Sequence, residues 1–126
     1  MREILFRGKR KDNYEWCEGF YARYRNKHYI IEMVNELIVN WHEVFPDTVG
    51  QYTGLNDRNG KQIFEGDILR TDLCAETLTV IFNVYCATFQ VLLPDGYSEG
   101  FCEQYSVTSH VKVIGNIHDN PELMEV

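Results

Sequence analysis

Apolar and polar residues alternate along most of the chain with a period of two. "REILFRGK" alternates through Ile4 and Phe6, and "EWCEGFYARY" alternates through Trp16 and, after Gly19, through Phe20. "KHYIIEMV" and "ELIVNWHEVF" follow, rich in β-branched and aromatic residues. This pattern predicts β-strands. The short polar breaks "GKRKDN", "RNK" and "VNE" leave little room for helical crossovers, so we expect an antiparallel meander of hairpins.

The second half of the chain continues the strand pattern with marked turns. "IFEGDILRTD" reads as a turn feeding a strand, in which Gly66 takes an unusual backbone angle and Asp67 caps the turn. "ETLTVIFNVYCATFQVLLPDGYSEG" predicts a strand, a turn and a further strand, closed by Pro94-Asp95-Gly96. "HVKVIGNI" predicts a strand with a bulge or bend at Gly115. In "NPELM", Asn120 before Pro121 predicts one terminal helical turn.

These elements predict an all-β fold. About five short strands with a Gly-Asp turn before the first and a tight final strand are typical of a small SH3-like barrel, whose closure removes exposed sheet edges. We expect this barrel over residues 55–126 and a separate antiparallel β meander over residues 1–54, packed together as one compact unit. A length of 126 residues is sufficient for a real core.

The run "GLNDRNGKQIFEGD" has the composition of a phosphate or calcium loop, but its spacing fits neither. A P-loop needs four residues between its glycines and Ser or Thr after the lysine, whereas Gly54 and Gly60 are separated by five and Gln62 follows Lys61. A calcium loop with Gly60 at its sixth position would have Leu55 as its first ligand. Asn59-Gly60 instead predicts a type I′ hairpin turn, with Asn56 and Asp57 as ordinary turn residues.

Composition points to a cytoplasmic protein without a cofactor. No stretch reaches the roughly eighteen apolar residues of a membrane helix, and the charged N-terminus carries no signal-peptide pattern. The cysteines form no C-x-x-C pair, and the histidines are scattered, so we expect free thiols and no metal site. These residues are Cys17, Cys74, Cys86, Cys102, His28, His42, His110 and His118.

Charge is distributed unevenly along the chain. The net charge is −7, but residues 1–29 hold eight basic and four acidic residues, and residues 30–126 hold four basic and fifteen acidic residues. Overall acidity disfavours nonspecific nucleic-acid binding, which depends on neutralising phosphates. The asymmetry suits head-to-tail contact between subunits, in which a basic surface meets an acidic one. We therefore expect a homo-oligomer.

One possible interaction face lies on the aromatic and basic N-terminal strands. Trp16 and Phe20 share a face that we expect in the core. The opposite face then carries the candidate contact residues, which are Tyr21, Arg23, Arg25 and Lys27. Aromatic residues interleaved with cations can stack bases and follow a nucleic-acid backbone, so a nucleic-acid-binding module is the alternative function.

No sequence pattern indicates catalysis. Glu65 and Asp67 are close in sequence, but a carboxylate pair acts as acid and base only where burial separates the two pKa values and a cleft admits substrate. In a turn, capping or solvation is the usual role of such residues. No nucleophile-elbow pattern or local His partner is present for a Ser or Cys nucleophile. We therefore expect a non-enzymatic protein.

Three stretches resemble, in order, the signatures of the YopX-like proteins of phages and prophages. They are "REILFRGK", "TVGQYTGLNDRNGKQIFEGDIL" at 48–69 and "VIGNIHDNPELM" at 113–124. The resemblance spans nearly the whole chain, except for residues 70–110. It implies an SH3-type barrel with an added N-terminal part, and it carries over no catalytic residue. Asn59, Gly60, Gly66 and Asp67 in the central signature each have a backbone reason for their residue type, so we interpret them as structural.

The resemblance also implies a biological setting. We expect an accessory protein encoded by a phage or mobile element and acting in the host cytoplasm. Its partners would be copies of itself and an unidentified phage or host protein, since neither a catalytic motif nor a cofactor site is present.

Overall fold

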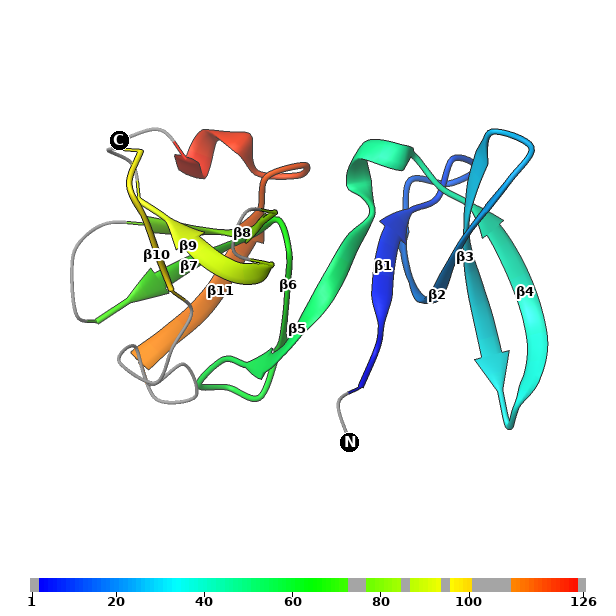
Figure 1. Ribbon diagram of the computed structural model, residues 1–126, viewed down its shortest axis with the longest axis horizontal. Helices are drawn as coiled ribbons and strands as arrows, with labels where there is room; N and C mark the ends of the chain where they lie inside the picture. The colour runs from blue at the N-terminus through cyan, green and yellow to red at the C-terminus, as the bar shows by residue number, and fades with distance from the viewer. Residues whose placement is uncertain (1–2, 73–76, 85–86, 94–95, 101–109, 125–126) are drawn as a thin grey trace. The chain divides into compact units, whose positions relative to one another are not determined.

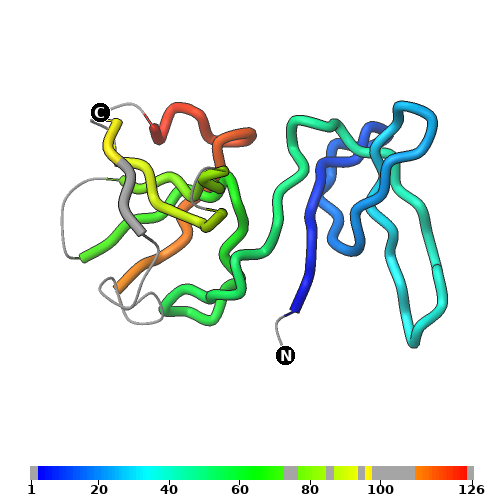
Figure 2. The backbone as a smooth tube through the Cα atoms, viewed as in Figure 1, coloured from blue at the N-terminus to red at the C-terminus, as the bar shows by residue number. Residues whose placement is uncertain are grey.

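The computed structural model describes residues 3–72, 77–84, 87–93, 96–100 and 110–124 (Figure 1). The described chain is almost entirely antiparallel β-structure, which confirms the all-β prediction. It divides into two compact units, Met1–Tyr52 and Thr53–Val126, whereas the sequence suggested a boundary between residues 54 and 55. Strand β5 (Gly50–Asn56) contains this boundary. Figure 2 shows the path of the backbone. None of the helices in the described part is long and apolar enough to cross a membrane.

The first unit is a meander of hairpins, as the alternating pattern predicted. Its strands lie in the order β4-β3-β2-β1-β5 and every neighbouring pair is antiparallel. The strands before β5 are β1 (Phe6–Lys9), β2 (Trp16–Tyr24), β3 (Lys27–Val34) and β4 (Leu37–Glu43). A short 3₁₀ helix, η1 (Pro46–Thr48), joins β4 to β5.

Two-residue turns set the register of the β2–β3 and β3–β4 hairpins. Arg25 and Asn26 both have positive φ angles, 51° and 63°, and so do Asn35 and Glu36, 51° and 66°. Two successive positive φ angles define a type I′ turn, whose twist matches that of the flanking strands. Asparagine tolerates this conformation better than most residues, which explains why "RNK" and "VNE" form tight turns.

Strand β2 bends at Gly19, where it changes its hydrogen-bonding partner. Residues 16–19 pair with β1, and residues 20–24 pair with β3. A Cβ atom at residue 19 would collide with the main-chain oxygen of Ile31. Only glycine therefore allows β3 to approach β2 this closely.

The second unit is built on a sheet of order β10-β9-β8-β7-β11. Its strands are β6 (Gln62–Phe64), β7 (Asp67–Thr71), β8 (Thr77–Asn83), β9 (Thr88–Leu92), β10 (Ser98–Gly100) and β11 (Val111–Asn116). Among the described strands this sheet is open, with β10 and β11 at its two edges, so the expected SH3-like barrel is not closed. The core is aliphatic and comprises Ile63, Leu69, Leu78, Val80, Val91, Val111 and Val113.

Local features of the second unit follow several sequence predictions. The register of β11 shifts between Val113 and Gly115, which confirms the predicted bulge. A 3₁₀ helix, η3 (Pro121–Met124), confirms the terminal helical turn. The Asn120 side chain, which the sequence predicted as the cap of this helical turn, accepts a hydrogen bond from the Asn116 N–H at 3.3 Å. Of the predicted Pro94-Asp95-Gly96 turn, the first two residues lie outside the described part.

The turn between β5 and β6 differs from the prediction. Asn59 does not have a positive φ angle, whereas Gly60 does (81°), so the turn is not type I′. The Gly60 N–H donates to the Asp57 carbonyl at 2.9 Å, so residues Asp57–Gly60 form a four-residue turn. The Asp57 N–H donates to the Lys61 carbonyl at 2.8 Å and closes the connection between the two strands. This five-residue connection is preferred over a two-residue type I′ turn because the Asp57 side chain accepts hydrogen bonds from main-chain N–H groups within it.

Asp57 is more than an ordinary turn residue. It is 3% exposed, and its Oδ1 accepts the N–H groups of Asn59 (2.8 Å) and Lys61 (2.9 Å). Its Oδ2 accepts the N–H of Val113 on β11 at 3.0 Å. Burial acts to raise the pKa of Asp57, but these three N–H groups hold it below the ordinary aspartate value. One carboxylate thus shapes the turn and fixes it to the last strand.

We expect Gly60→Val to destabilise the protein by about 1–3 kcal/mol, because a β-branched residue is strained at a φ of 81°. A Cβ at residue 60 would meet no atom within 4 Å, so backbone strain is the sole steric cost. Asn59→Ala should cost less. Thermal unfolding checks both variants, and an unchanged melting midpoint for Gly60→Val would show that the turn assignment is wrong.

Candidate functional site

The outward face of the β2–β3–β4 hairpins is apolar and exposed. In the register of these strands, Phe20 lies opposite Ile31, and Ile31 lies opposite Trp41. Cross-strand partners share a sheet face, so the three side chains lie side by side. Phe20 is 50% exposed and Trp41 is 53% exposed. Large apolar residues at such exposure on neighbouring strands form a patch rather than scattered exceptions.

The patch extends along all three strands. Tyr24 is four residues after Phe20 and lies on the same face of β2. Met33 is two residues after Ile31 on β3, and it pairs with Ile38 on β4. We call this patch the apolar face and define it by its exposed members Phe20, Tyr24, Met33, Ile38 and Trp41. A shallow hollow of about 410 Å³ within it is lined by Ala22, Arg23, Tyr24, Tyr29 and Trp41. The Tyr29 and Trp41 rings meet edge to face at 5.8 Å.

Strand β4 is also the edge strand of this sheet. The C-terminal end of β4 is bonded to the chain after β1, because the Lys11 N–H donates to the Glu43 carbonyl at 3.0 Å and Val44 forms a β-bridge with Arg10. Within the described residues, Leu37–His42 pairs with β3 on one side and with no strand on the other. This stretch, "LIVNWH", contains neither lysine nor proline, two residues that protect a sheet edge, although its register with β3 shifts between Glu32 and Met33.

Comparisons with known proteins agree with this architecture. The model of the YopX protein family matches residues 5–125. The chain belongs to the YopX family. The crystal structure of protein EF1440 from Enterococcus faecalis has a TM-score of 0.63 and 22% sequence identity, and the alignment covers 99% of this chain and 100% of that one. This likeness shows a shared fold. No curated protein matches the chain.

In this YopX family chain, the inner and outer faces of β2 are the reverse of the sequence-based assignment for Phe20 and Tyr21. The Tyr21 ring packs on Phe6 at 5.7 Å and stacks on His28 at 5.7 Å, and its hydroxyl lies 2.5 Å from His28 Nδ1. Tyr21 also pairs with the fully buried Ile30. Phe20 consequently points outward. A period of two separates two faces but does not tell which one meets the rest of the unit.

The four predicted contact residues do not form one face. Tyr21 lies inward, and Arg23 is exposed at the hollow of the apolar face. Arg25 lies in the type I′ turn with its guanidinium 5.2 Å from the Tyr24 ring. Lys27 Nζ lies 4.0 Å from Glu43 Oε1. Arg23 and Arg25 thus border the apolar face, while Lys27 is directed to a carboxylate. Trp16 is half-buried, with Arg7 over its ring at 4.8 Å.

The charge asymmetry of the sequence is reduced by local pairing. Arg10 bonds Asp12 at 2.7 Å, and Lys11 bonds Glu43 at 2.9 Å, so part of the N-terminal positive charge is matched within the first unit. By residue count, Met1–Tyr52 holds eight basic and eight acidic residues, and the whole net charge of −7 belongs to Thr53–Val126. Apolar contact therefore has to supply most of any self-association.

The residues of the Gly-Asp turn have structural positions. Gly66 has a φ of 92°, its N–H donates to the Val80 carbonyl at 2.8 Å, and its carbonyl accepts the Ile117 N–H at 2.9 Å. Asp67 is 1% exposed and accepts the Phe64 N–H at 2.8 Å, so it caps the turn as expected. A carboxyl so enclosed cannot receive a substrate from solution, which weakens the acid-pair hypothesis for Glu65 and Asp67.

Cys17 has no mark of a reactive thiol. Burial raises its pKa to about 11, and its Sγ donates to the Gly8 carbonyl at 3.5 Å. Cys74, Cys86 and Cys102 lie outside the described residues. Across the part of the chain that the structure describes, no group of three His, Cys, Asp or Glu side chains could hold a metal ion.

Proposed function

We propose that the chain is a non-enzymatic accessory protein of a phage or prophage, acting in the host cytoplasm through self-association. The observation that carries self-association is the apolar face together with the open β4 edge. An antiparallel strand that pairs with its own copy across a two-fold axis is complementary to itself, because each contact occurs twice. β4 can therefore continue the sheet into a second subunit, with the two apolar faces adjoining.

Simple energetics indicate a modest affinity for such a dimer. Pairing along β4 brings Ile38 and Trp41 against the partner subunit, and burying the exposed half of each contributes about 1 kcal/mol. Two copies then contribute about 4 kcal/mol. Association costs about 4–15 kcal/mol in lost translational and rotational freedom, so backbone pairing along β4 is needed to reach micromolar affinity. The charges at the rim, Arg23 and Arg25, contribute orientation more than affinity.

We expect light scattering after size exclusion at micromolar concentration to give at least twice the 14.8 kDa mass of the chain. Trp41→Lys or Ile38→Lys should return the protein to a monomer, since each places a charge in the buried contact. Val84→Lys is the matched control, because Val84 is 73% exposed in the second unit. A wild-type monomer would exclude self-association and leave binding of a phage or host protein as the function.

A second candidate is binding of single-stranded nucleic acid. Arg23 lies at a hollow lined by Tyr29 and Trp41, and an aromatic hollow with a cation can stack a base. The zero net charge of the first unit opposes it. Titration with single- and double-stranded DNA and RNA at two salt concentrations separates the two functions, because nucleic-acid binding weakens steeply with salt.

A further inference from the structure

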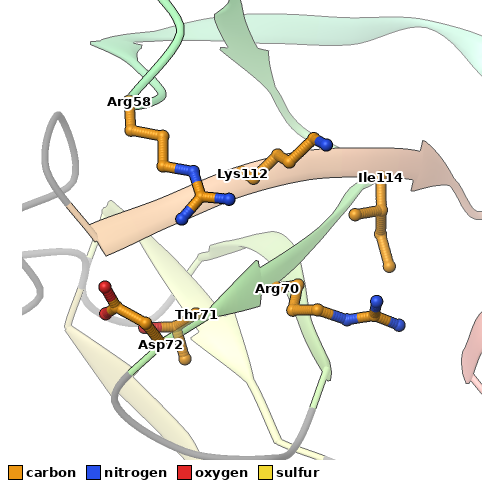
Figure 3. Close-up of a pocket in the computed structure, with 6 residues that line it drawn as sticks. All are labelled: Arg58, Arg70, Thr71, Asp72, Lys112 and Ile114. Carbon is orange, nitrogen blue, oxygen red and sulfur yellow. The ribbon is translucent and has the colours of Figure 1, made fainter.

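A pocket in the second unit gathers positive charge. It has a volume of about 270 Å³ and is lined by Arg58, Arg70, Thr71, Asp72, Lys112 and Ile114 (Figure 3). Figure 3 shows the Arg58 side chain reaching from the β5–β6 turn toward strands β7 and β11. The other residues lie on these two strands or directly after β7. The pocket is thus formed by three segments that are distant in sequence.

The fold places the main chain of each cationic residue at the pocket. Arg70 on β7 and Lys112 on β11 are cross-strand partners, so they lie on the same face of the sheet. Arg58 is positioned by its main chain, because its N–H donates to the Val111 carbonyl at 3.0 Å. The neighbouring Asp57 carboxylate accepts the Val113 N–H and secures the same turn on β11. The backbone of the turn is therefore anchored on both sides of Lys112.

Positive charge is concentrated at this pocket although the second unit as a whole is acidic. Residues 53–126 contain eleven acidic residues and four basic ones, and three of the four basic residues line this pocket. Within the described residues, none of these three has an ion pair. The nearby Asp72 instead bonds His110 Nδ1 at 3.0 Å. Like charges placed directly opposite on a sheet are destabilising, so a bound anion would relieve the repulsion between Arg70 and Lys112.

We propose that this pocket binds a phosphate group. The Arg58 and Arg70 guanidiniums can each donate two hydrogen bonds to an oxyanion, and Lys112 adds a point charge. Three cations against one Asp72 carboxylate match the two charges of a phosphate ester better than the single charge of a carboxylate. The volume lies just below the range of about 300–1,000 Å³ typical of ligand pockets, so it admits a phosphate and a small attached group.

Calorimetric titration with inorganic pyrophosphate tests the proposal. The wild type should bind it saturably, and Arg58→Gln, Arg70→Gln and Lys112→Gln should each weaken binding about tenfold or more. Lys61→Gln is the matched control, because it removes the fourth cation of the same unit without touching the pocket, and it should weaken binding less than about threefold. Unfolding curves confirm that all four variants fold.

Two results would overturn the phosphate site. One is the absence of saturable pyrophosphate binding. The other is a weakening by Lys61→Gln equal to that by the three pocket variants, which would show that binding depends on the net charge of the unit alone. A ten-nucleotide thymidine strand identifies the source of the phosphate group. Displacement of pyrophosphate by this strand assigns the site to a nucleic-acid backbone, and its failure to displace assigns the site to a small phosphorylated ligand.

Discussion

Asp57→Ala should lower the free energy of unfolding by about 3–5 kcal/mol, a large part of the stability of a small domain. The substitution leaves three backbone N–H groups, those of Asn59, Lys61 and Val113, without their charged acceptor. Asp57→Asn should cost about 2 kcal/mol, because its oxygen still accepts from the turn while its amide nitrogen faces the Val113 N–H. Urea unfolding followed by far-ultraviolet circular dichroism measures both, since both tryptophans lie in the first unit and Asp57 lies in the second.

The pH dependence of stability gives an independent test of Asp57. Its pKa is lowered in the folded protein, so its stabilisation is fully present above the unfolded value of about 3.9 and disappears as the pH falls through the lower folded value. Asp57→Asn should therefore lose less stability on acidification than the wild type. As a control, Asp72→Ala removes an exposed carboxylate and should cost less than about 1 kcal/mol. An equal cost for both residues would contradict the role of Asp57.

Gly19→Ala should destabilise the first unit by about 3 kcal/mol or more, because the new Cβ collides with the Ile31 carbonyl, a main-chain atom that cannot rotate away. Strand β3 would have to move away from β2 at the point where β2 changes its partner from β1 to β3. Thermal unfolding monitored by circular dichroism is the measurement. The contact with main chain distinguishes this site from glycines that are needed only for their φ angle.

Gly54→Ala provides the comparison for Gly19→Ala. Gly54 has a φ of 87°, and a Cβ there would meet nothing within 4 Å, so the cost should stay near 1–2 kcal/mol. If Gly19→Ala costs no more than Gly54→Ala, the close approach of β2 and β3 is not a determinant of stability.

The strands and the positions of their turns could be predicted because both depend on local sequence, but the type of the β5–β6 turn was predicted wrongly. The period of two found the hairpins of the first unit, and asparagine-containing breaks mark two-residue turns. The buried face could not be predicted in this way. Tyr21 lies inward because Phe6 of another strand packs on it, and Phe20 lies outward, although both are aromatic neighbours on β2. The apolar run "LIV" on β4 is typical of a buried strand, so the sequence did not indicate its exposure.

The phosphate pocket was beyond sequence reasoning for a related reason. Arg58, Arg70 and Lys112 line one pocket only because β7 pairs with β11 and the β5–β6 turn docks on β11. The sequence showed Asp57 as a turn residue, and its bond to Val113 spans 56 residues. The scarcity of basic residues after residue 52 was visible, but their convergence was not.

The bond between Asp57 and Val113 has a consequence for the order in which the protein forms during translation. Every strand pair of β1 to β4 lies within residues 6–43, so these hairpins can form while the chain is still being synthesised. Oδ1 of Asp57 bonds within the β5–β6 turn, but Oδ2 gains its partner, the Val113 N–H, only after β11 has left the ribosome. The hairpins of the first unit, with the β4 edge, can therefore be complete before the second unit of the same chain exists.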